Sequence, residues 1–193
     1  FNWTKNFKIM FDQLSELVKQ FGGEAVVNNP AVPNEQNDAV MHEAGGSILS
    51  GLKDMVASGN ISDLTGMLTG KTPIDGNNPV VKQLTEKVTG NLGEKFGLSS
   101  DAAGSVAGGL IPQILGGLVN KAKDPNQPGF NMNDLVSAIS GGQGGGLMDA
   151  VSKYGGQFGL DQNNDGKVDM SDAMSAVTKK GGLGGLLGKL FGK

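Results

Sequence analysis

Apolar side chains recur at helical spacing along most of this chain. Near the start, one helical face carries Phe11, Leu14, Leu17, Val18 and Phe21. The Gly22-Gly23 pair that follows is expected to stop this helix. β-branched residues do not alternate with polar ones over any useful length, so no strand is predicted. The pattern indicates an all-α fold.

The same spacing predicts further helices, separated by stretches rich in Gly, Pro, Asn and Asp. They are expected over about residues 35–57 with an interruption at Gly45-Gly46, and over 63–68, 79–88, 99–121 and 132–139. Ser62 is expected to cap the helix that follows it. Pro79 suits a first helical turn, and Pro112 is expected to kink or split the helix that contains it.

The helical pattern also repeats, at an offset of about 63 to 71 residues. Gln13-Leu-Ser-Glu-Leu-Val resembles Gln83-Leu-Thr-Glu-Lys-Val, Gly45-Gly-Ser-Ile-Leu resembles Gly108-Gly-Leu-Ile, and Ile61-Ser-Asp-Leu resembles Met132-Asn-Asp-Leu. Because the order is the same in both copies, we predict an irregular multi-helical array built from two related three-helix units. The predicted divisions are residues 1–9 (an extension), 10–70, 71–145, 146–180 (a helix-loop-helix) and 181–193 (a Gly/Leu-rich amphipathic helix).

Composition narrows the class of protein. Glycine accounts for 33 of the 193 residues, which favours short helices that end at glycines over long rigid ones. Cysteine is absent, so a disulfide framework and a thiolate metal site are excluded. All 16 basic residues are Lys, scattered along a chain of net charge −3, so nucleic-acid binding is not expected.

No segment has the 18 or more apolar residues typical of a membrane span. The longest apolar stretch, residues 106–119, is interrupted by four glycines and by Pro112. We therefore expect no transmembrane helix.

One segment carries recognisable binding chemistry. Residues 161–172 read D-Q-N-N-D-G-K-V-D-M-S-D, which is the ligand order of an EF-hand calcium loop. The predicted metal ligands are Asp161, Asn163, Asp165, Lys167 through its carbonyl, Asp169 and Asp172. Calcium takes six to eight oxygen ligands, so a short loop must wrap around the ion, and Gly166 allows the sharp turn.

The last position of this loop sets the expected affinity. Asp172 stands where a bidentate Glu is usual, and its shorter side chain reaches the ion less easily. We expect weak binding of calcium, with a dissociation constant of about 10⁻⁴–10⁻³ M, and some tolerance of magnesium.

Two other interpretations of the loop stay open. Asp, Asn and Gly are ordinary turn residues, and Asp169 or Ser171 is suited to cap the following helix. The similarity of Met132-Asn-Asp-Leu-Val to Met170-Ser-Asp-Ala-Met also gives Asp172 a structural origin as a helix-start residue. The loop resembles a dockerin half-repeat, but dockerins carry two copies and this chain has one. A single loop likewise argues against a calmodulin-like sensor, since EF-hands usually occur in pairs.

A resemblance covers about residues 10–145 and the final segment. The stretch Asp101-Ala-Ala-Gly-Ser-Val-Ala-Gly-Gly-Leu-Ile-Pro-Gln-Ile-Leu-Gly-Gly-Leu, then Asp134-Leu-Val-Ser-Ala-Ile, resembles the YidB-like family of uncharacterised bacterial proteins. The ending Gly181-Gly-Leu-Gly-Gly-Leu-Leu-Gly-Lys-Leu-Phe-Gly-Lys resembles it too. The resemblance implies an all-helical fold and a bacterial source, and it brings no catalytic residues. The calcium-type loop lies outside the shared part.

An enzyme is not expected. His42 is the single histidine, and beside Glu43 it is a candidate metal or acid–base group, although an ordinary packing role is favoured. No nucleophile–base pair can be argued from the sequence. The Gly-rich runs lack the G-K-[ST] ending of a phosphate loop.

The final segment, which we call the Gly/Leu tail (residues 181–193), is suited to docking. Its apolar residues at helical spacing are Leu183, Leu186, Leu187, Leu190 and Phe191, with Lys179, Lys180, Lys189 and Lys193 nearby. Each glycine between them lowers helicity by about 1 kcal/mol relative to alanine, so a stable helix needs a partner surface. Docking on protein is favoured, and peripheral membrane contact is the alternative.

The sequence thus predicts a non-enzymatic interaction or structural module with one calcium ion. The alternative is an accessory subunit that docks onto, or occludes, a larger cell-envelope or secretion assembly through its Gly/Leu-rich helices, with an unidentified protein partner. A millimolar calcium site favours a periplasmic location, whereas a start at Met10 would favour the cytoplasm.

Overall fold

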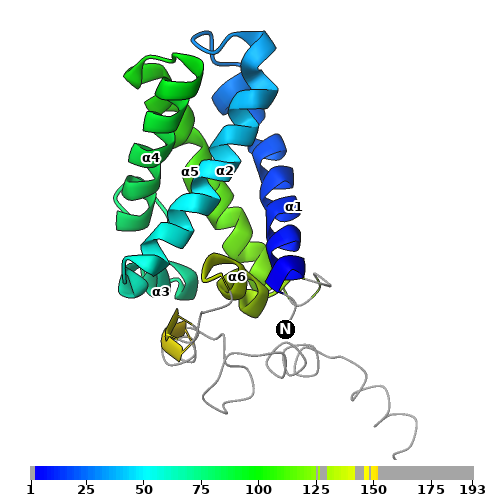
Figure 1. Ribbon diagram of the computed structural model, residues 1–193, viewed down its shortest axis with the longest axis vertical. Helices are drawn as coiled ribbons and strands as arrows, with labels where there is room; N and C mark the ends of the chain where they lie inside the picture. The colour runs from blue at the N-terminus through cyan, green and yellow to red at the C-terminus, as the bar shows by residue number, and fades with distance from the viewer. Residues whose placement is uncertain (1–2, 125, 127–129, 142–145, 148, 152–193) are drawn as a thin grey trace, which may run out of the picture.

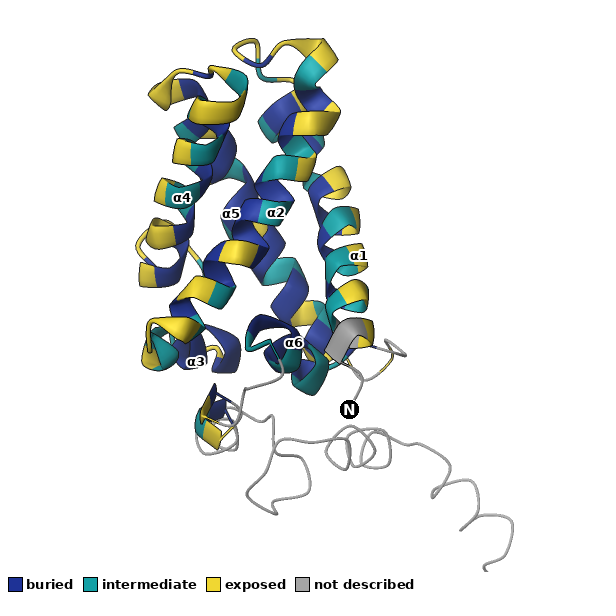
Figure 2. Ribbon diagram, viewed as in Figure 1, coloured by how far each residue is buried: buried dark blue, intermediate teal, exposed yellow. Residues whose placement is uncertain are grey.

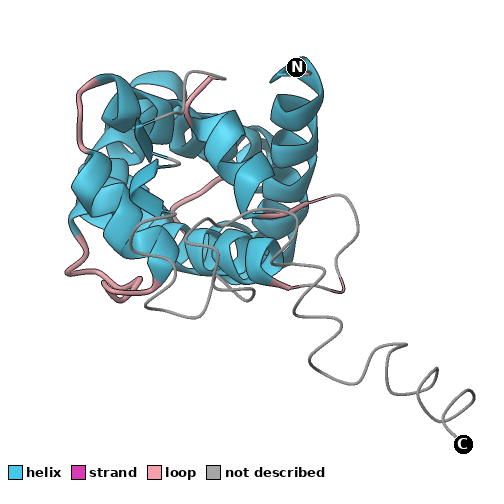
Figure 3. Cartoon of the chain, turned by 90° about the horizontal axis from the view of Figure 1, so that it is seen from below, coloured by secondary structure: helices cyan, strands magenta, loops and turns pink. Residues whose placement is uncertain are grey.

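The computed structural model describes residues 3–124, 126, 130–141, 146–147 and 149–151. Its α-helices are α1 (Trp3–Gly22), α2 (Asn37–Ala57), α3 (Ile61–Thr69), α4 (Pro79–Phe96), α5 (Ser100–Lys123) and α6 (Met132–Ile139). A π-helical turn, Gly23–Val27, and a 3-10 turn, Asn34–Gln36, lie between α1 and α2. No strand occurs in the described ranges, as Figure 3 also shows, so the all-α prediction is confirmed.

The four long helices form the body of the molecule. α5 packs against α4 and α1, and α2 packs against the same two helices. Figure 1 shows α2 and α5 crossing each other between α4 and α1. The short helices α3 and α6 lie at the lower end in this view, where α3 contacts α2 and α4, and α6 contacts α1, α2 and α5.

This packing has an internal correspondence. If α1, α2 and α3 are exchanged for α4, α5 and α6, the pair α1–α2 becomes α4–α5, and α1–α5 becomes α4–α2. The pair α1–α6 likewise becomes α4–α3, and α2–α3 becomes α5–α6. The long helices of each half therefore pack on those of the other half. The domain divisions predicted from the sequence stay a prediction, whereas the buried apolar residues form one continuous cluster from Met10 to Val151.

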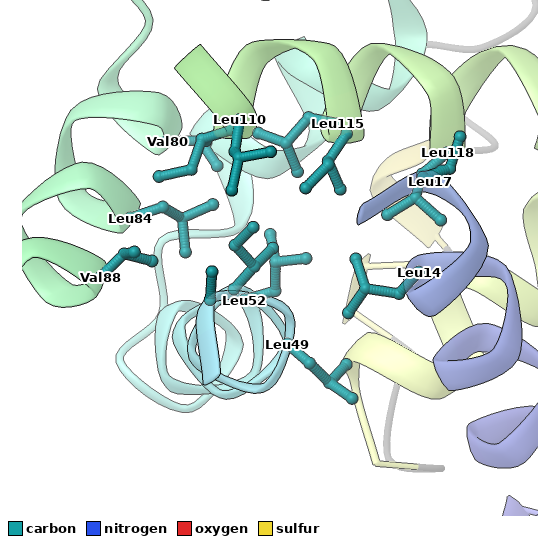
Figure 4. Close-up of a cluster of buried hydrophobic side chains, with 14 of the residues drawn as sticks. Leu14, Leu17, Leu49, Leu52, Val80, Leu84, Val88, Leu110, Leu115 and Leu118 are labelled. Atoms are coloured by element: carbon teal, nitrogen blue, oxygen red, sulfur yellow. The ribbon is translucent and has the colours of Figure 1, made fainter. Parts of the chain in front are cut away.

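The core lies where α1, α2, α4 and α5 meet. Figure 4 shows its Leu and Val side chains converging from all four helices: Leu14 and Leu17, Leu49 and Leu52, Val80, Leu84 and Val88, and Leu110, Leu115 and Leu118. Each of these residues is at most 4% exposed. Buried surfaces face inward on every long helix (Figure 2), as the helical spacing of the apolar residues requires.

Both ends of α1 bear on predictions made from the sequence. Residues 1–9 were predicted as an extension, and that division stays a prediction. The described residues 3–9 are continuous with the helix, and Phe7 and Ile9 pack against the core. Gly22-Gly23 was expected to stop the helix, but the chain continues through a wider turn that buries Val26 completely. The backbone N–H of Asn28 donates to the carbonyl of Gly23 at 2.9 Å and closes this turn. Burial of Val26 outweighs the low helix propensity of two glycines.

The expected interruption of α2 at Gly45-Gly46 is also absent, because α2 is a single helix of 21 residues. Gly45 is buried, and a Cβ atom there would lie 3.4 Å from Cγ2 of Val18 on α1. A larger side chain would therefore press on α1. This glycine serves close helix packing and does not end the helix.

The helix starts are partly as expected. Pro79 is the first residue of α4, and the side chain of Asn78 accepts a hydrogen bond from the N–H of Val80 at 2.9 Å. Ser62 was expected to cap α3, but the helix begins one residue earlier, at Ile61, with Asn60 in the cap position. Asn60 makes no side-chain cap, so α3 depends on its buried residues.

Pro112 does not split α5, which runs unbroken for 24 residues. A proline lacks the N–H that would bond the carbonyl four residues earlier, here that of Gly108. At the next position, the side-chain amide of Gln113 donates to the carbonyl of Gly109 at 2.9 Å. Buried residues on both sides of Pro112, from Val106 to Val119, hold the helix in the core.

Within the part of the chain that the structure describes, α5 alone has the length and composition to cross a membrane. The most apolar window has a mean hydropathy of 1.5, and 56% of it is buried inside the molecule. Buried core helices also meet these criteria of length and hydropathy. The contacts of α5 with α1, α4 and α6 account for its apolar character.

α6 has the bounds predicted from the sequence, and a reciprocal cap explains its sharp start. The N–H of Asp134 donates to the side chain of Asn131 at 3.1 Å, and the N–H of Asn131 donates to the carboxylate of Asp134 at 3.2 Å. This pair satisfies two backbone donors of a helix that has only eight residues.

We expect Asn131→Ala to lower the free energy of unfolding by about 1 kcal/mol, because the first turn of α6 loses its cap. Urea denaturation followed by circular dichroism measures this change. Asn133→Ala, inside the same helix, is the matched control and is expected to have little effect. Equal stability of the two variants would contradict a capping role for Asn131.

Candidate functional site

The predicted metal ligands Asp161, Asn163, Asp165, Lys167, Asp169 and Asp172 all lie outside the described residues. The calcium site therefore stays a prediction. In the described ranges, no three His, Asp or Glu side chains come together in a way that could hold a metal ion.

A groove lies between α1 and α2, with a volume of about 380 Å³. α1 lines it with Phe11, Ser15, Val18 and Lys19, and α2 lines it with Asp38, Met41, His42 and Gly45. This volume is within the range of about 300–1,000 Å³ that is typical of ligand-binding clefts. We call this feature the α1/α2 groove.

Aromatic contacts hold the two helices together along the groove. The rings of Phe11 and His42 meet edge to face, with centroids 5.9 Å apart and an interplanar angle of 68°. Nearer the start of α1, the ammonium group of Lys53 lies 4.1 Å from the centre of the Phe7 ring, a cation–π contact. The groove thus has an apolar floor, and the contact between Phe7 and Lys53 joins the two helices beyond the Phe11 end of the groove.

The corresponding helices α4 and α5 pack along each other more extensively than α1 and α2 do. The offset of 63 residues that relates Gly45 to Gly108 pairs Met41 and His42 with Gly104 and Ser105. Gly104 is small enough that a Cβ atom there would lie 3.9 Å from Oγ1 of Thr89 on α4. At the matching positions of α2, the larger side chains of Met41 and His42 line the open groove. This groove was not predicted from the sequence, and the size difference at these two positions is the signal that could have indicated it.

His42 is exposed and forms no hydrogen bond with the neighbouring Glu43. The carboxylate of Glu43 instead accepts from Oγ of Ser47 at 3.2 Å and from the ammonium of Lys95 at 2.7 Å. The described partner of His42 is the Phe11 ring. The favoured packing role of His42 agrees with this geometry.

Ser15, His42 and Asp38 line the same groove, but no hydrogen bond joins any two of them. An activated serine needs its base at about 2.6–3.2 Å. The groove is therefore an apolar surface with polar edges, and no nucleophile–base pair is assembled among these three side chains.

The edges of the groove carry one charge of each sign. Neither Asp38 nor Lys19 takes part in an ion pair with another described residue. Neighbouring acids are occupied: Glu16 pairs with Lys121 at 2.9 Å, and Glu43 pairs with Lys95. Asp38 is thus an exposed carboxylate at the edge of an apolar surface, available to a cation.

Two shifted pKa values occur away from the groove. Burial raises the pKa of Asp134 above its usual range, and this is opposed by the hydrogen bond from the backbone of Asn131 and by the charge of Lys5. Partial burial lowers the pKa of Lys123. Asp134 belongs to the cap of α6, and Lys123 is the last residue of α5.

Fold and groove together define an all-α helical bundle with an open interhelical groove. The family described as a bacterial protein of unknown function (DUF937) matches residues 78–193, more than half of the chain. The chain belongs to this bacterial family. No curated protein and no solved structure gives a significant match.

The matched range differs from the resemblance expected from the sequence. It begins at Asn78, the cap of α4, and includes α4, α5 and α6. It also includes the calcium-type loop 161–172, which was expected to lie outside the shared part, and it excludes residues 10–77. The groove helices α1 and α2 therefore lie outside the matched range, whereas the loop and the Gly/Leu tail lie inside it.

Proposed function

We propose that this protein is a non-enzymatic helical module with a structural or interaction role in a bacterium, and that it binds one calcium ion in the loop 161–172. The observation that carries the proposal is the order of oxygen-bearing residues in that loop, with Gly166 at the sixth position and Val168 at the eighth. The ligands would be Asp161, Asn163, Asp165, the carbonyl of Lys167, Asp169 and Asp172. Magnesium is the expected competitor.

The position of the loop supports an architectural role for the ion. The described helical core extends to Val151, and the Gly/Leu tail begins at Gly181, so the loop lies between them in the chain. A bound ion that gathers several side chains of one short segment would fix the course of the chain between core and tail.

Calcium is expected to raise the melting temperature of the full chain. At ten times its dissociation constant, a ligand that binds only the folded state adds about 1.4 kcal/mol, or about 3–6 °C for a protein of this size. The double variant Asp161→Ala, Asp165→Ala should lose this increase. Calorimetry with calcium and with a chelator measures it, and magnesium at the same concentration should give a smaller increase.

The matched control is Glu86→Ala, Glu94→Ala, which removes the same two charges from exposed positions of α4 that form no ion pair with described residues. This control should keep the full response to calcium. Melting of the unaltered chain at one temperature with calcium and with chelator would refute the calcium proposal.

The alternative is an accessory subunit that docks onto a larger envelope or secretion assembly. The feature that favours it is the helical spacing of Leu and Phe in the Gly/Leu tail, which needs a surface to pack against. Recovery from native membranes discriminates between the two: a stoichiometric partner that is lost when the tail is removed supports docking. For the calcium-binding module, a weak site suits the calcium-rich periplasm. We also propose that the chain belongs to the YidB-like family.

A further inference from the structure

We propose that the Gly/Leu tail, residues 181–193, docks as a helix in the α1/α2 groove of its own chain. The groove has an apolar floor, open edges and an acidic side chain without an ion-pair partner among the described residues. The tail offers an apolar face and only positive charge. This inference does not depend on calcium binding.

The dimensions of the two surfaces agree. The groove is lined along α1 from Phe11 to Lys19, a length of about 12 Å at the helical rise of 1.5 Å per residue. The apolar residues of the tail, from Leu183 to Phe191, cover the same number of positions and the same length as a helix. A groove of about 380 Å³ gives room for several apolar side chains.

The spacing within the tail gives one continuous face. Leu183 is followed by apolar residues three, four, seven and eight positions later, which is the pattern of an amphipathic helix. The positions between them include glycines, which allow close approach of two helices but weaken a helix that stands alone. A helix of this composition therefore forms against a surface.

The charge at the edge of the groove also suits the tail as its occupant. Residues 173–193 contain Lys179, Lys180, Lys189 and Lys193 and no Asp or Glu. Asp38 at the groove edge is exposed and is not paired with any described cation, whereas Glu43 and Glu16 nearby already hold lysines. A lysine of the tail would complete the pairing of Asp38, and Lys19 on the other edge disfavours a more basic occupant.

The connection is long enough. The described chain reaches Val151, and Gly181 lies thirty positions further along the chain. A fully extended segment of this length spans at most about 100 Å. α1, with 20 residues, is only about 30 Å long. Attachment to the same chain also raises the local concentration of the tail, so weak contacts suffice for docking.

The absence of cysteine allows a direct test in the full chain. Ser15→Cys places a thiol in the groove, and Gly184→Cys places one at the border of the apolar face of the tail. With a mild oxidant at low protein concentration, we expect this pair to form an intramolecular disulfide at least about ten times faster than a control pair does. The control combines Gly184→Cys with Ser105→Cys, the same substitution at an exposed position of α5.

Adding Leu187→Asp to the groove pair should reduce its rate to that of the control, because a carboxylate then faces the apolar floor. Lys19→Cys is a second reporter on the groove edge should Ser15→Cys disturb folding. Equal rates for the groove and control pairs would overturn the proposal. Disulfide-linked dimers in place of the intramolecular product would overturn it as well, since they would place the tail on a second copy.

The charge pairing has its own test. Asp38→Asn in the groove pair should slow disulfide formation about two- to fivefold at low salt, with a smaller effect at high salt. Asp101→Asn is the matched control, because Asp101 also lies in the first turn of a long helix and is exposed. An equal effect of both variants would show that Asp38 does not guide the tail.

Discussion

Replacing Leu84 by alanine is expected to lower the free energy of unfolding by about 2–5 kcal/mol. Leu84 lies on α4 with no exposed surface, and Figure 4 shows it among Val80, Val88 and Leu110. It also faces α2, where its side chain lies against Gly51. Truncation therefore removes buried apolar contacts from three helices and leaves a cavity that a continuous core cannot easily close.

Urea denaturation followed by the helical circular dichroism signal measures this loss, with the slope of the transition as a check on two-state behaviour. Val27→Ala is the control, because Val27 is 45% exposed. Its effect should be within about 0.5 kcal/mol. A loss below about 1 kcal/mol for Leu84→Ala would mean that α4 does not share one core with α2 and α5.

Much of the fold could be predicted because its determinants are local. The helical spacing of apolar residues identified α1 to α6, the α-helices defined within the described ranges, and α6 was placed correctly from Met132 to Ile139. There, a capping residue precedes the apolar run and Gly141, with a positive φ of 64°, follows it. Where both ends of a helix carry such signals, the sequence is sufficient to predict where the helix begins and ends.

Glycine was the main source of error. Gly22-Gly23 and Gly45-Gly46 were interpreted as helix breaks, although the chain stays helical through both pairs. Low helix propensity is a local property, amounting to about 1 kcal/mol per glycine. Whether a glycine ends a helix or lets another helix approach depends on what packs against it. That information is tertiary, and the sequence of one helix does not contain it.

The two candidate sites differ in the same way. The calcium-type loop can be recognised in the sequence because all its ligands lie in one segment of twelve residues, and it stays a prediction because residues 161–172 are outside the described ranges. The α1/α2 groove depends on which helices pair. Phe11 and Met41 are ordinary core-like residues in the sequence, and only the packing of α1 on α2 places both beside an open surface.

Gly51→Leu is expected to lower the free energy of unfolding by about 2–3 kcal/mol, even though leucine is the better helix former. Gly51 is buried where α2 crosses α4. A Cβ atom there would collide with the end of the Leu84 side chain and would lie 3.2 Å from Cδ of Lys87. Because Leu84 has no exposed surface, it has little room to move away.

Gly46→Leu separates this packing effect from helix propensity. Gly46 lies in the same helix, and a Cβ atom there would have no atom within 4 Å, so this variant should be neutral or slightly stabilising. The double variant Gly51→Leu, Leu84→Ala should lose less stability than the sum of the two single losses, since the new side chain fills the vacated space. Urea denaturation of all four variants gives this coupling. Strict additivity would mean that positions 51 and 84 do not touch, and that α2 and α4 pack in a different register.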